Sequence, residues 1–381
     1  MQIMQMLRLA EAEKNNQKSL GHAMQALLLA SRLRNDELQA RVYARMSYNY
    51  RSQRTPHLYY VDSLAVVSAR RSGNDLLLFN AIDAYVRDLL NENKLRQIAT
   101  LLHQSDSLAG LNDTLQRRAD VALLRSADEY KRLRMRPALV FAQTSLKYAR
   151  MAEAESSIAE ALSWIAGCYS NLSRYDSAAD HYFQSLDIWK KTGDGSHTAR
   201  IYSGLGALYK TSGDLSSAIS YHRRAFAIFN EENDEIQAAY EQLNIAEVFL
   251  RQKKRDSALI ILRTADATFR RLNNAQGLLL SSSTFSKYYM FSGNKDSAGH
   301  YIRLTQQYLQ KSESPSLDYY ASAFKVINDI HQGNITEGET GLRKLLVQTK
   351  ELLPEEMIVN AITKLNLPDM TDTSKILLKN I

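Results

Sequence analysis

The stretch GLGALYKTSGDLSSAISYHRRA, residues 204–225, holds three glycines within ten residues, followed by a histidine and two arginines. Such glycines occur in loops that bind phosphate, and they also occur where two helices cross closely. A dinucleotide-binding loop follows a buried strand and opens a helix. No β-branched apolar segment precedes Gly204, and no GxxxxGK[ST] sequence occurs in the chain. The stretch therefore favours helix packing over a phosphate site.

The same stretch is one copy of a pattern that repeats every 40 residues. The triplet Asp-Ser-Ala occurs at 176–178, 256–258 and 296–298, and Ser216-Ser217-Ala218 occupies the equivalent place in the quoted stretch. Small residues continue this register at Ala138, Ala178, Ala218, Ala258, Ala298 and Gly338. Aromatic residues recur with the same step at Tyr169, Tyr209, Phe249 and Tyr289. Because several columns repeat together, the sequence predicts a repeat protein.

Each repeat is expected to form two helices joined by a short turn. Apolar residues recur three and four positions apart within each half, as one face of a helix requires. The halves are separated by breaks such as 211–214 and 291–294, where glycine or asparagine can end a helix. We expect Asp214 to cap the second helix, and Gly206 to face Ala218 and Ala225 where the helices cross. One hairpin cannot bury both of its faces, so the hairpins must stack.

These residues resemble the tetratricopeptide repeat. Tyr202-x2-Leu205-Gly206-x2-Tyr209, followed by Ala218 and Ala225, is similar to the family pattern W-x2-L-G-x2-Y with later alanines. The usual repeat has about 34 residues, whereas the step here is 40. The chain thus resembles the longer subclass found in bacterial regulators, peptide-pheromone sensors and some eukaryotic scaffolds.

The resemblance implies an all-α fold, a right-handed α-solenoid (superhelix) of about nine antiparallel helix hairpins with a C-terminal capping helix. We expect one superhelix over residues 1–366. Within it the repeats are degenerate at 1–118 and clear at 119–352, and the capping helix covers 353–366. Residues 367–381 form a C-terminal tail with no assigned role.

The resemblance also implies a binding groove, lined on the concave face by the first helix of each hairpin. Family members line this groove with the second, fifth, ninth, twelfth and thirteenth places of each repeat. The predicted groove residues are Arg200, Ser203, Lys210, Tyr240, Leu243, Glu247, Arg251, Leu280, Lys287, Met290, Phe291, Tyr320, Ile327 and His331. Chaperone-binding members hold a C-terminal carboxylate with lysine and asparagine at the fifth and ninth places, where this chain has residues such as Ser203 and Ala207. We therefore expect an extended peptide or an amphipathic helix rather than a chaperone tail.

Patterns for catalysis and metal binding are absent from the sequence. None of the eight histidines forms HExxH or pairs with another at metal-ligand spacing. The single cysteine, Cys168, is expected to be a buried, inert thiol. His222 stands where the family has a large aromatic residue, so we expect a partly buried histidine with its polar edge bonded. A ligand or pH-sensing role for His222 is the alternative. We predict a non-catalytic protein with no cofactor.

The net charge of +7 comes entirely from residues 1–155, where Lys and Arg outnumber Asp and Glu by 7. A candidate anion patch comprises Lys131, Arg132, Arg134 and Arg136 in a turn, and Lys253, Lys254 and Arg255 form a similar cluster. Solvated turns are the simpler interpretation. The alternative is an anchor for an acidic partner, a phosphate or nucleic acid.

The sequence as a whole indicates a scaffold that binds a protein or peptide in a concave groove. One alternative is the sensing module of a bacterial signalling or transcriptional regulator whose output domain lies outside this chain. Another is a nucleic-acid-associated protein that uses the basic N-terminal half, although no nucleic-acid-binding motif supports it. No apolar run approaches the roughly 20 residues of a membrane helix. The absence of a signal peptide predicts a cytoplasmic protein if Met1 is the native start; a trimmed chain would leave a periplasmic or other extracytoplasmic location open.

Overall fold

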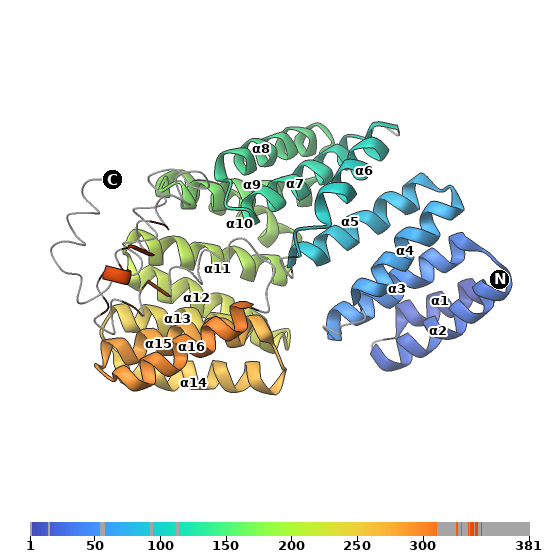
Figure 1. Cartoon of the computed structure of the whole chain (residues 1–381). Coiled ribbons are helices and arrows are strands. Elements are labelled where there is room, and N and C mark those ends of the chain that lie inside the picture. Colours follow the sequence, from blue (N-terminus) through green and yellow to red (C-terminus); the bar gives the residue numbers. More distant parts are fainter. Residues whose placement is uncertain are drawn as a thin grey trace. The chain divides into compact units, whose positions relative to one another are not determined.

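The computed structural model describes residues 2–13, 16–53, 58–91, 94–111 and 114–310, with isolated positions between 325 and 344. These residues form sixteen α-helices and no strand (Figure 1). The prediction of an all-α fold is confirmed for this part of the chain. The predicted capping helix at 353–366 and the tail at 367–381 lie outside the described residues, as does most of the expected hairpin at 319–350.

The chain divides into two compact units, Met1–Asp128 and Glu129–Ile381. In the first unit each odd-numbered helix packs on the helix that follows it, as hairpins require. The helices of this unit are α1 (Gln2–Ala12), α2 (Asn16–Arg32), α3 (Asp36–Gln53), α4 (Leu58–Ser72), α5 (Asp75–Asn91) and α6 (Ile98–Leu111), and α7 (Leu115–Lys131) begins in it. The single superhelix over 1–366 stays a prediction.

The second unit continues the series of hairpins with helices of 16 to 18 residues. Here α9 packs on α10, and the next three pairs, α11 with α12, α13 with α14 and α15 with α16, form hairpins in the same way. The helices are α8 (Met135–Met151), α9 (Glu155–Asn171), α10 (Tyr175–Thr192), α11 (Gly195–Ser212), α12 (Leu215–Glu231), α13 (Glu235–Arg251), α14 (Arg255–Arg271), α15 (Ala275–Phe291) and α16 (Lys295–Gln310).

The helices of the second unit end at intervals of 20 residues, half of the repeat step. Each turn contains one residue with a positive φ: Leu133, Glu153, Ser173, Gly193, Gly213, Asn233, Lys253, Asn273 and Gly293. After most of these residues the next N–H donates to a carbonyl five positions earlier, as from Arg174 to Tyr169 at 2.9 Å, which is a Schellman ending. The expectation of glycine or asparagine there is only partly right. The other side chains accept a left-handed conformation that costs about 1 kcal/mol each.

The second helix of the quoted hairpin begins as predicted. Asp214 is the N-cap of α12, and its side chain accepts a hydrogen bond from the Ser217 N–H at 3.0 Å. Gly213 precedes it with φ of 99°, a conformation that favours glycine. The turn between α11 and α12 therefore has glycine at its left-handed position and aspartate at the N-cap, and both positions favour these residue types.

Two of the three glycines of the quoted stretch, Gly204 and Gly206, lie against aromatic rings. A Cβ on Gly206 would lie 2.7 Å from three ring atoms of His222, and a Cβ on Gly204 would lie 2.7 Å from the Tyr182 ring. The side chain nearest to Gly206 is thus His222, which lies on α12 between Ala218 and Ala225. This contact supports the interpretation of Gly206 as a place of close helix packing.

The first helices of successive hairpins in the second unit also contact one another. Contacts join α9 to α11, α11 to α13 and α13 to α15. The second helices pack mainly on their neighbours in the chain. In a stack of hairpins, the helices that approach each other more closely from repeat to repeat lie on the inner side of the curve. The first helices therefore form the inner face of this unit.

Candidate functional site

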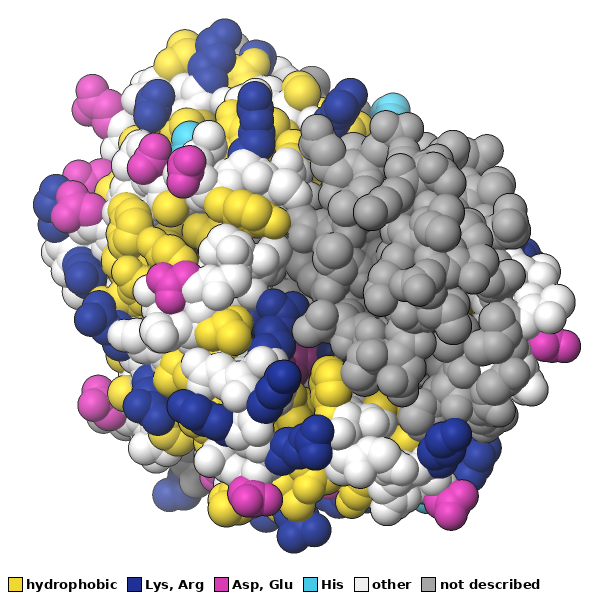
Figure 2. Space-filling view, turned by 90° about the vertical axis from the view of Figure 1, so that its left-hand side faces the viewer, with side chains coloured by type: hydrophobic (Ala, Val, Ile, Leu, Met, Phe, Trp, Pro, Cys, Tyr) yellow, Lys and Arg dark blue, Asp and Glu magenta, His cyan; other side chains and the backbone are white. Residues whose placement is uncertain are grey.

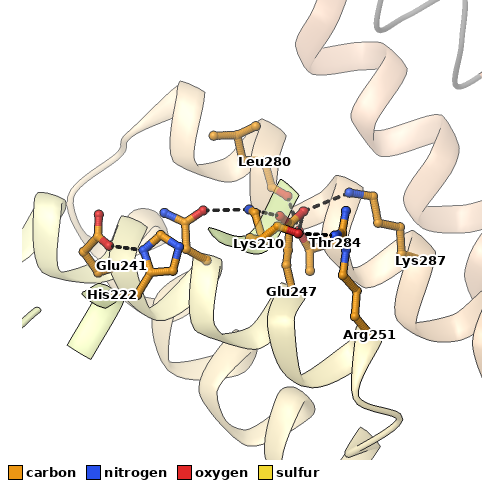
Figure 3. A network of polar contacts seen from close by, with 9 residues as sticks. Lys210, His222, Glu241, Glu247, Arg251, Leu280, Thr284 and Lys287 are labelled. Atoms are coloured by element: carbon orange, nitrogen blue, oxygen red, sulfur yellow. Dashed lines mark hydrogen bonds and ion pairs between the residues drawn. The ribbon is translucent and has the colours of Figure 1, made fainter. Parts of the chain in front are cut away.

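Three successive first helices each place a charged side chain at the same point of this inner face. Lys210 lies on α11, Glu247 on α13 and Lys287 on α15. The Lys210 Nζ atom donates to Glu247 Oε2, and the Lys287 Nζ atom donates to Glu247 Oε1, both at 2.8 Å (Figure 3). One carboxylate thus links three repeats. Sequence spacings of 37 and 40 residues bring these groups together.

Arg251 adds a third cation to this group, which we call the Glu247 cluster: Lys210, Glu247, Arg251 and Lys287. The Arg251 Nη1 atom donates to the backbone oxygen of Lys210 at 2.6 Å. Lys210 Nζ also donates to Asn244 Oδ1 at 3.2 Å, so contacts on both sides fix this lysine. Two lysines bind the carboxylate directly, and Arg251 lies beside them on the Lys210 backbone, so the four side chains together carry a net charge of +2.

The electrostatics of the cluster keep Glu247 ionised. Burial alone would raise the pKa of Glu247, but the charges and hydrogen bonds of Lys210 and Lys287 outweigh burial and hold the pKa well below its usual range. The three side chains are only partly exposed, which limits screening by water. Glu247 is therefore a charged partner of both lysines across the neutral pH range.

A second polar group lies beneath the same face and includes His222. The His222 Nδ1 atom lies 2.7 Å from Glu241 Oε2, and the Ser203 hydroxyl donates to Glu241 Oε1 at 2.6 Å (the His222–Glu241 pair is shown in Figure 3). His222 is completely buried and Glu241 almost so, while the Nε2 atom of His222 has no hydrogen-bond partner. His222 is thus more deeply buried than the partly buried histidine that we expected, and only one of its two nitrogens is bonded.

The other predicted groove residues in the described range fall into two groups. Arg200 and Leu280 are exposed, and Met290 and Phe291 are half-buried, so all four reach the surface. Leu243 is only 5% exposed and belongs to the hydrophobic core between α13, α14 and α15. Tyr240 packs on this core, with its ring 4.9 Å from that of Phe269 and its hydroxyl donating to Asn274 at 2.9 Å. Tyr320, Ile327 and His331 lie outside the described residues.

Sequence reasoning did not single out Glu241, Asn244 or Thr284, whose hydroxyl donates to Glu247 Oε1 at 3.5 Å. Glu241 shares its repeat column with Ala161, Ile201 and Ser281, so an acidic residue in a column of small and apolar residues was an available signal. The residue types of Asn244 and Thr284 did not distinguish them from the other polar residues of their helices. Their positions depend on the angle between α13 and its neighbours, which the spacing of residues does not fix.

The candidate anion patch lies in the turn between α7 and α8. Lys131 and Arg132 are half-buried, whereas Arg134 and Arg136 are exposed. Arg134 forms an ion pair with Glu129 at 3.2 Å. Elsewhere in the basic N-terminal part, Arg51, Arg87 and Arg125 also pair with aspartates. These four arginines are therefore locally neutralised, although the surplus of seven positive charges in residues 1–155 remains.

The visible face in Figure 2 shows the same mixture of charges. Lys and Arg side chains are interspersed with Asp, Glu and hydrophobic side chains over the described part of this face, without one continuous basic area. Nucleic-acid binding relies on a patch or stripe of positive charge. This face therefore gives the nucleic-acid alternative no support.

Two further kinds of reactive group are the Cys168 thiol and side chains that could bind a metal ion. Burial raises the pKa of the Cys168 thiol to about 12, which keeps it protonated and unreactive. Within the described ranges, no three His, Cys, Asp or Glu side chains gather as a metal site would require. Likewise, none of the helices described is both long and apolar enough to cross a membrane.

A buried acidic pair in the first unit was not predicted. The Asp62 carboxylate of α4 accepts a hydrogen bond from Ser47, and Asp88 of α5 binds Arg51 of α3 through two bonds at 2.7 and 2.6 Å. Both aspartates are almost completely buried. Burial, with the nearby charge of Asp88, raises the pKa of Asp62 to about 7, although the Ser47 hydrogen bond and Arg51 act in the opposite direction.

This pair should make the first unit less stable as the pH rises. Asp62 holds a proton in the folded unit that it loses near its ordinary pKa of 3.8 in the unfolded chain. The contribution is therefore complete below pH 3.8 and is lost as the pH rises to about 7. We expect hydrogen exchange in α3–α5, corrected for intrinsic rates, to become faster over this range. Asp62→Asn should remove this dependence, and an unchanged dependence in the variant would assign it to other groups.

The comparisons with known proteins agree with this fold. Residues 157–231 match the family model of the tetratricopeptide repeat. A Rap protein solved in complex with the competence and sporulation factor is 13% identical, with a TM-score of 0.67 over 92% of this chain and 97% of that chain. The Rap conjugation gene regulator of plasmid pLS20, solved with the Phr* peptide, is 16% identical, with a TM-score of 0.59 over 87% and 91%.

A third structural neighbour is aspartyl phosphate phosphatase F from Bacillus subtilis. It is 12% identical, with a TM-score of 0.57 over 90% of this chain and 91% of that chain. At such identities the likeness shows a shared fold, and it confirms the predicted helical solenoid. No curated protein sequence matches the chain significantly.

Proposed function

Since the chain carries tetratricopeptide repeats, we propose that the inner face of its second unit binds an extended segment of a peptide or partner protein. The observation that carries this proposal is the convergence of side chains from three successive first helices on the Glu247 cluster. Leu280 and Phe291 add apolar surface on α15, the helix that also carries Lys287. Alternating charged and apolar groups suit a peptide whose backbone runs across the repeats.

The structural neighbours support a peptide ligand. The Rap conjugation gene regulator has the same fold and was solved with a peptide. This likeness also favours the sensing-module alternative, in which peptide binding to the repeats controls an output. The prediction that the chain is non-catalytic stays a prediction, because one neighbour of this fold is named a phosphatase.

Peptide selection tests the proposal without knowledge of the natural ligand. A library of random decapeptides displayed on phage is selected on the immobilised chain, and the dissociation constants of enriched peptides are measured. We expect Leu280→Asp and Lys287→Ala each to weaken binding roughly tenfold, the effect of losing one well-placed contact of about 1.4 kcal/mol. In the Lys287→Ala variant Lys210 still pairs with Glu247, so the fold should persist.

Arg223→Glu is the matched control, because Arg223 is exposed on α12, a second helix. It should leave the affinity unchanged. If no peptide is enriched, or if Arg223→Glu weakens binding as much as the two inner-face variants, the proposed groove is wrong. Binding of duplex DNA that persists at physiological salt would instead favour the nucleic-acid alternative.

A further inference from the structure

We propose that the Glu247 cluster is a binding site for a carboxylate of the ligand, and that Glu247 itself fills this site while the ligand is absent. The inference rests on the proposed peptide-binding function and names the chemistry of its ligand. Glu247 accepts one lysine on each carboxylate oxygen, as a bound acidic group would. The chain thus supplies an internal competitor for its own anion site.

The cations remain in place when Glu247 turns away. Lys210 is held by Asn244 as well as by Glu247, and Arg251 is anchored to the Lys210 backbone through one of its nitrogens. Arginine has five N–H donors, so a guanidinium with one such anchor can offer others to a ligand. Lys287 is 37% exposed and gives the cluster an open side. Lys210, Arg251 and Lys287 all point toward Glu247 in Figure 3.

The net positive charge of the Glu247 cluster indicates which class of ligand the site would bind. Lys210 and Lys287 share the Glu247 carboxylate, and Arg251 donates to a backbone oxygen rather than to a carboxylate, so the net charge of +2 attracts a second negative charge even before Glu247 moves. A neutral or basic peptide side chain gains nothing from this arrangement. The ligand should therefore carry an acidic side chain or a free C-terminal carboxylate at this point of the groove.

If Glu247 competes with the ligand carboxylate, removing the charge of Glu247 should strengthen binding rather than weaken it. Glu247→Gln keeps the size of the side chain and removes one negative charge within a few ångströms of the incoming carboxylate. We expect this variant to bind acidic peptides roughly tenfold more tightly than the native chain does, because a like charge close to the ligand has gone. If Glu247 served only to hold the lysines in place, Glu247→Gln would bind acidic peptides more weakly than the native chain does.

The test uses decapeptides selected on the native chain. Each is compared with a counterpart in which Asp and Glu are replaced by Asn and Gln, and with a C-terminally amidated form, to separate side-chain from terminal carboxylates. We expect selection on the native chain to enrich acidic peptides. Glu247→Gln should strengthen binding of the acidic form and leave binding of the neutral counterpart unchanged. Glu231→Gln, which removes an exposed charge on α12, should change neither affinity.

Lys287→Met supplies a second variant whose fold is kept by the remaining Lys210–Glu247 pair. This variant should weaken binding of the acidic peptide several-fold more than binding of the neutral one, as expected when a cation near a carboxylate is removed. Enriched peptides without acidic preference, or weaker acidic binding by Glu247→Gln, would overturn this inference while leaving the groove intact. Failure to enrich any peptide would contradict the proposed function as well.

Discussion

Replacing either His222 or Glu241 alone with leucine should lower the free energy of unfolding of the second unit by about 3–5 kcal/mol. The two side chains are joined at 2.7 Å and almost inaccessible to water, so His222→Leu leaves buried Glu241 with only its Ser203 hydrogen bond, and Glu241→Leu removes the hydrogen bond of the buried His222. Leucine is close to histidine in volume, so the loss should reflect the broken polar pair more than a cavity.

The double variant separates this cause from packing. With both residues replaced by leucine, no buried charge is left unpaired, and the unpartnered Nε2 atom of His222 also disappears. Buried ion pairs replaced by apolar residues are often neutral or stabilising. We therefore expect the double variant to be more stable than either single variant. Fluorescence of Trp164 and Trp189, both in the second unit, reports its unfolding in denaturant. Additive losses would contradict the pairing.

Gly206→Leu should have the second largest effect, a loss of about 3 kcal/mol from overpacking. Even the first carbon of a new side chain would lie 2.7 Å from the His222 ring. That ring has no room to move, because it is completely buried and tied to Glu241. The crossing of α11 and α12 would have to open, and the denaturation midpoint of the second unit should fall.

Gly110→Leu is a control for placing leucine at a helical glycine, and its effect is read from the unfolding of the first unit by circular dichroism. Gly110 also lies in a helix, α6, and a Cβ built there meets no atom within 4 Å. This variant should keep or slightly raise stability, since leucine favours helix more than glycine does. If Gly206→Leu is tolerated equally well, the close crossing at Gly206 is wrong.

The repeat pattern was sufficient to predict the fold, because packing in a solenoid is local. The recurrence of Ala178, Ala218 and Ala258 every 40 residues identifies where helices cross, and all three are fully buried. The sequence was less informative about turns. Leu133 and Lys253 adopt positive φ although neither residue type favours it, because the Schellman hydrogen bonds around them outweigh the local preference.

The candidate site was predictable in its helices but not in its contacts. Family places indicated Lys210, Glu247 and Lys287 separately, yet no sequence rule showed that one carboxylate bridges both lysines. Leu243 was expected in the groove, but a single place in a repeat can face either the groove or the core according to the local helix rotation. Apolar surroundings from α14 and α15 draw Leu243 into the core.

Hydrogen exchange measured with a selected acidic decapeptide shows directly where on the chain the peptide binds. If the inner face of the second unit binds the peptide, amide exchange should slow in α11, α13 and α15, with little change in α10, α12, α14 and α16. Protection confined to those second helices, or to the first unit, would contradict the account.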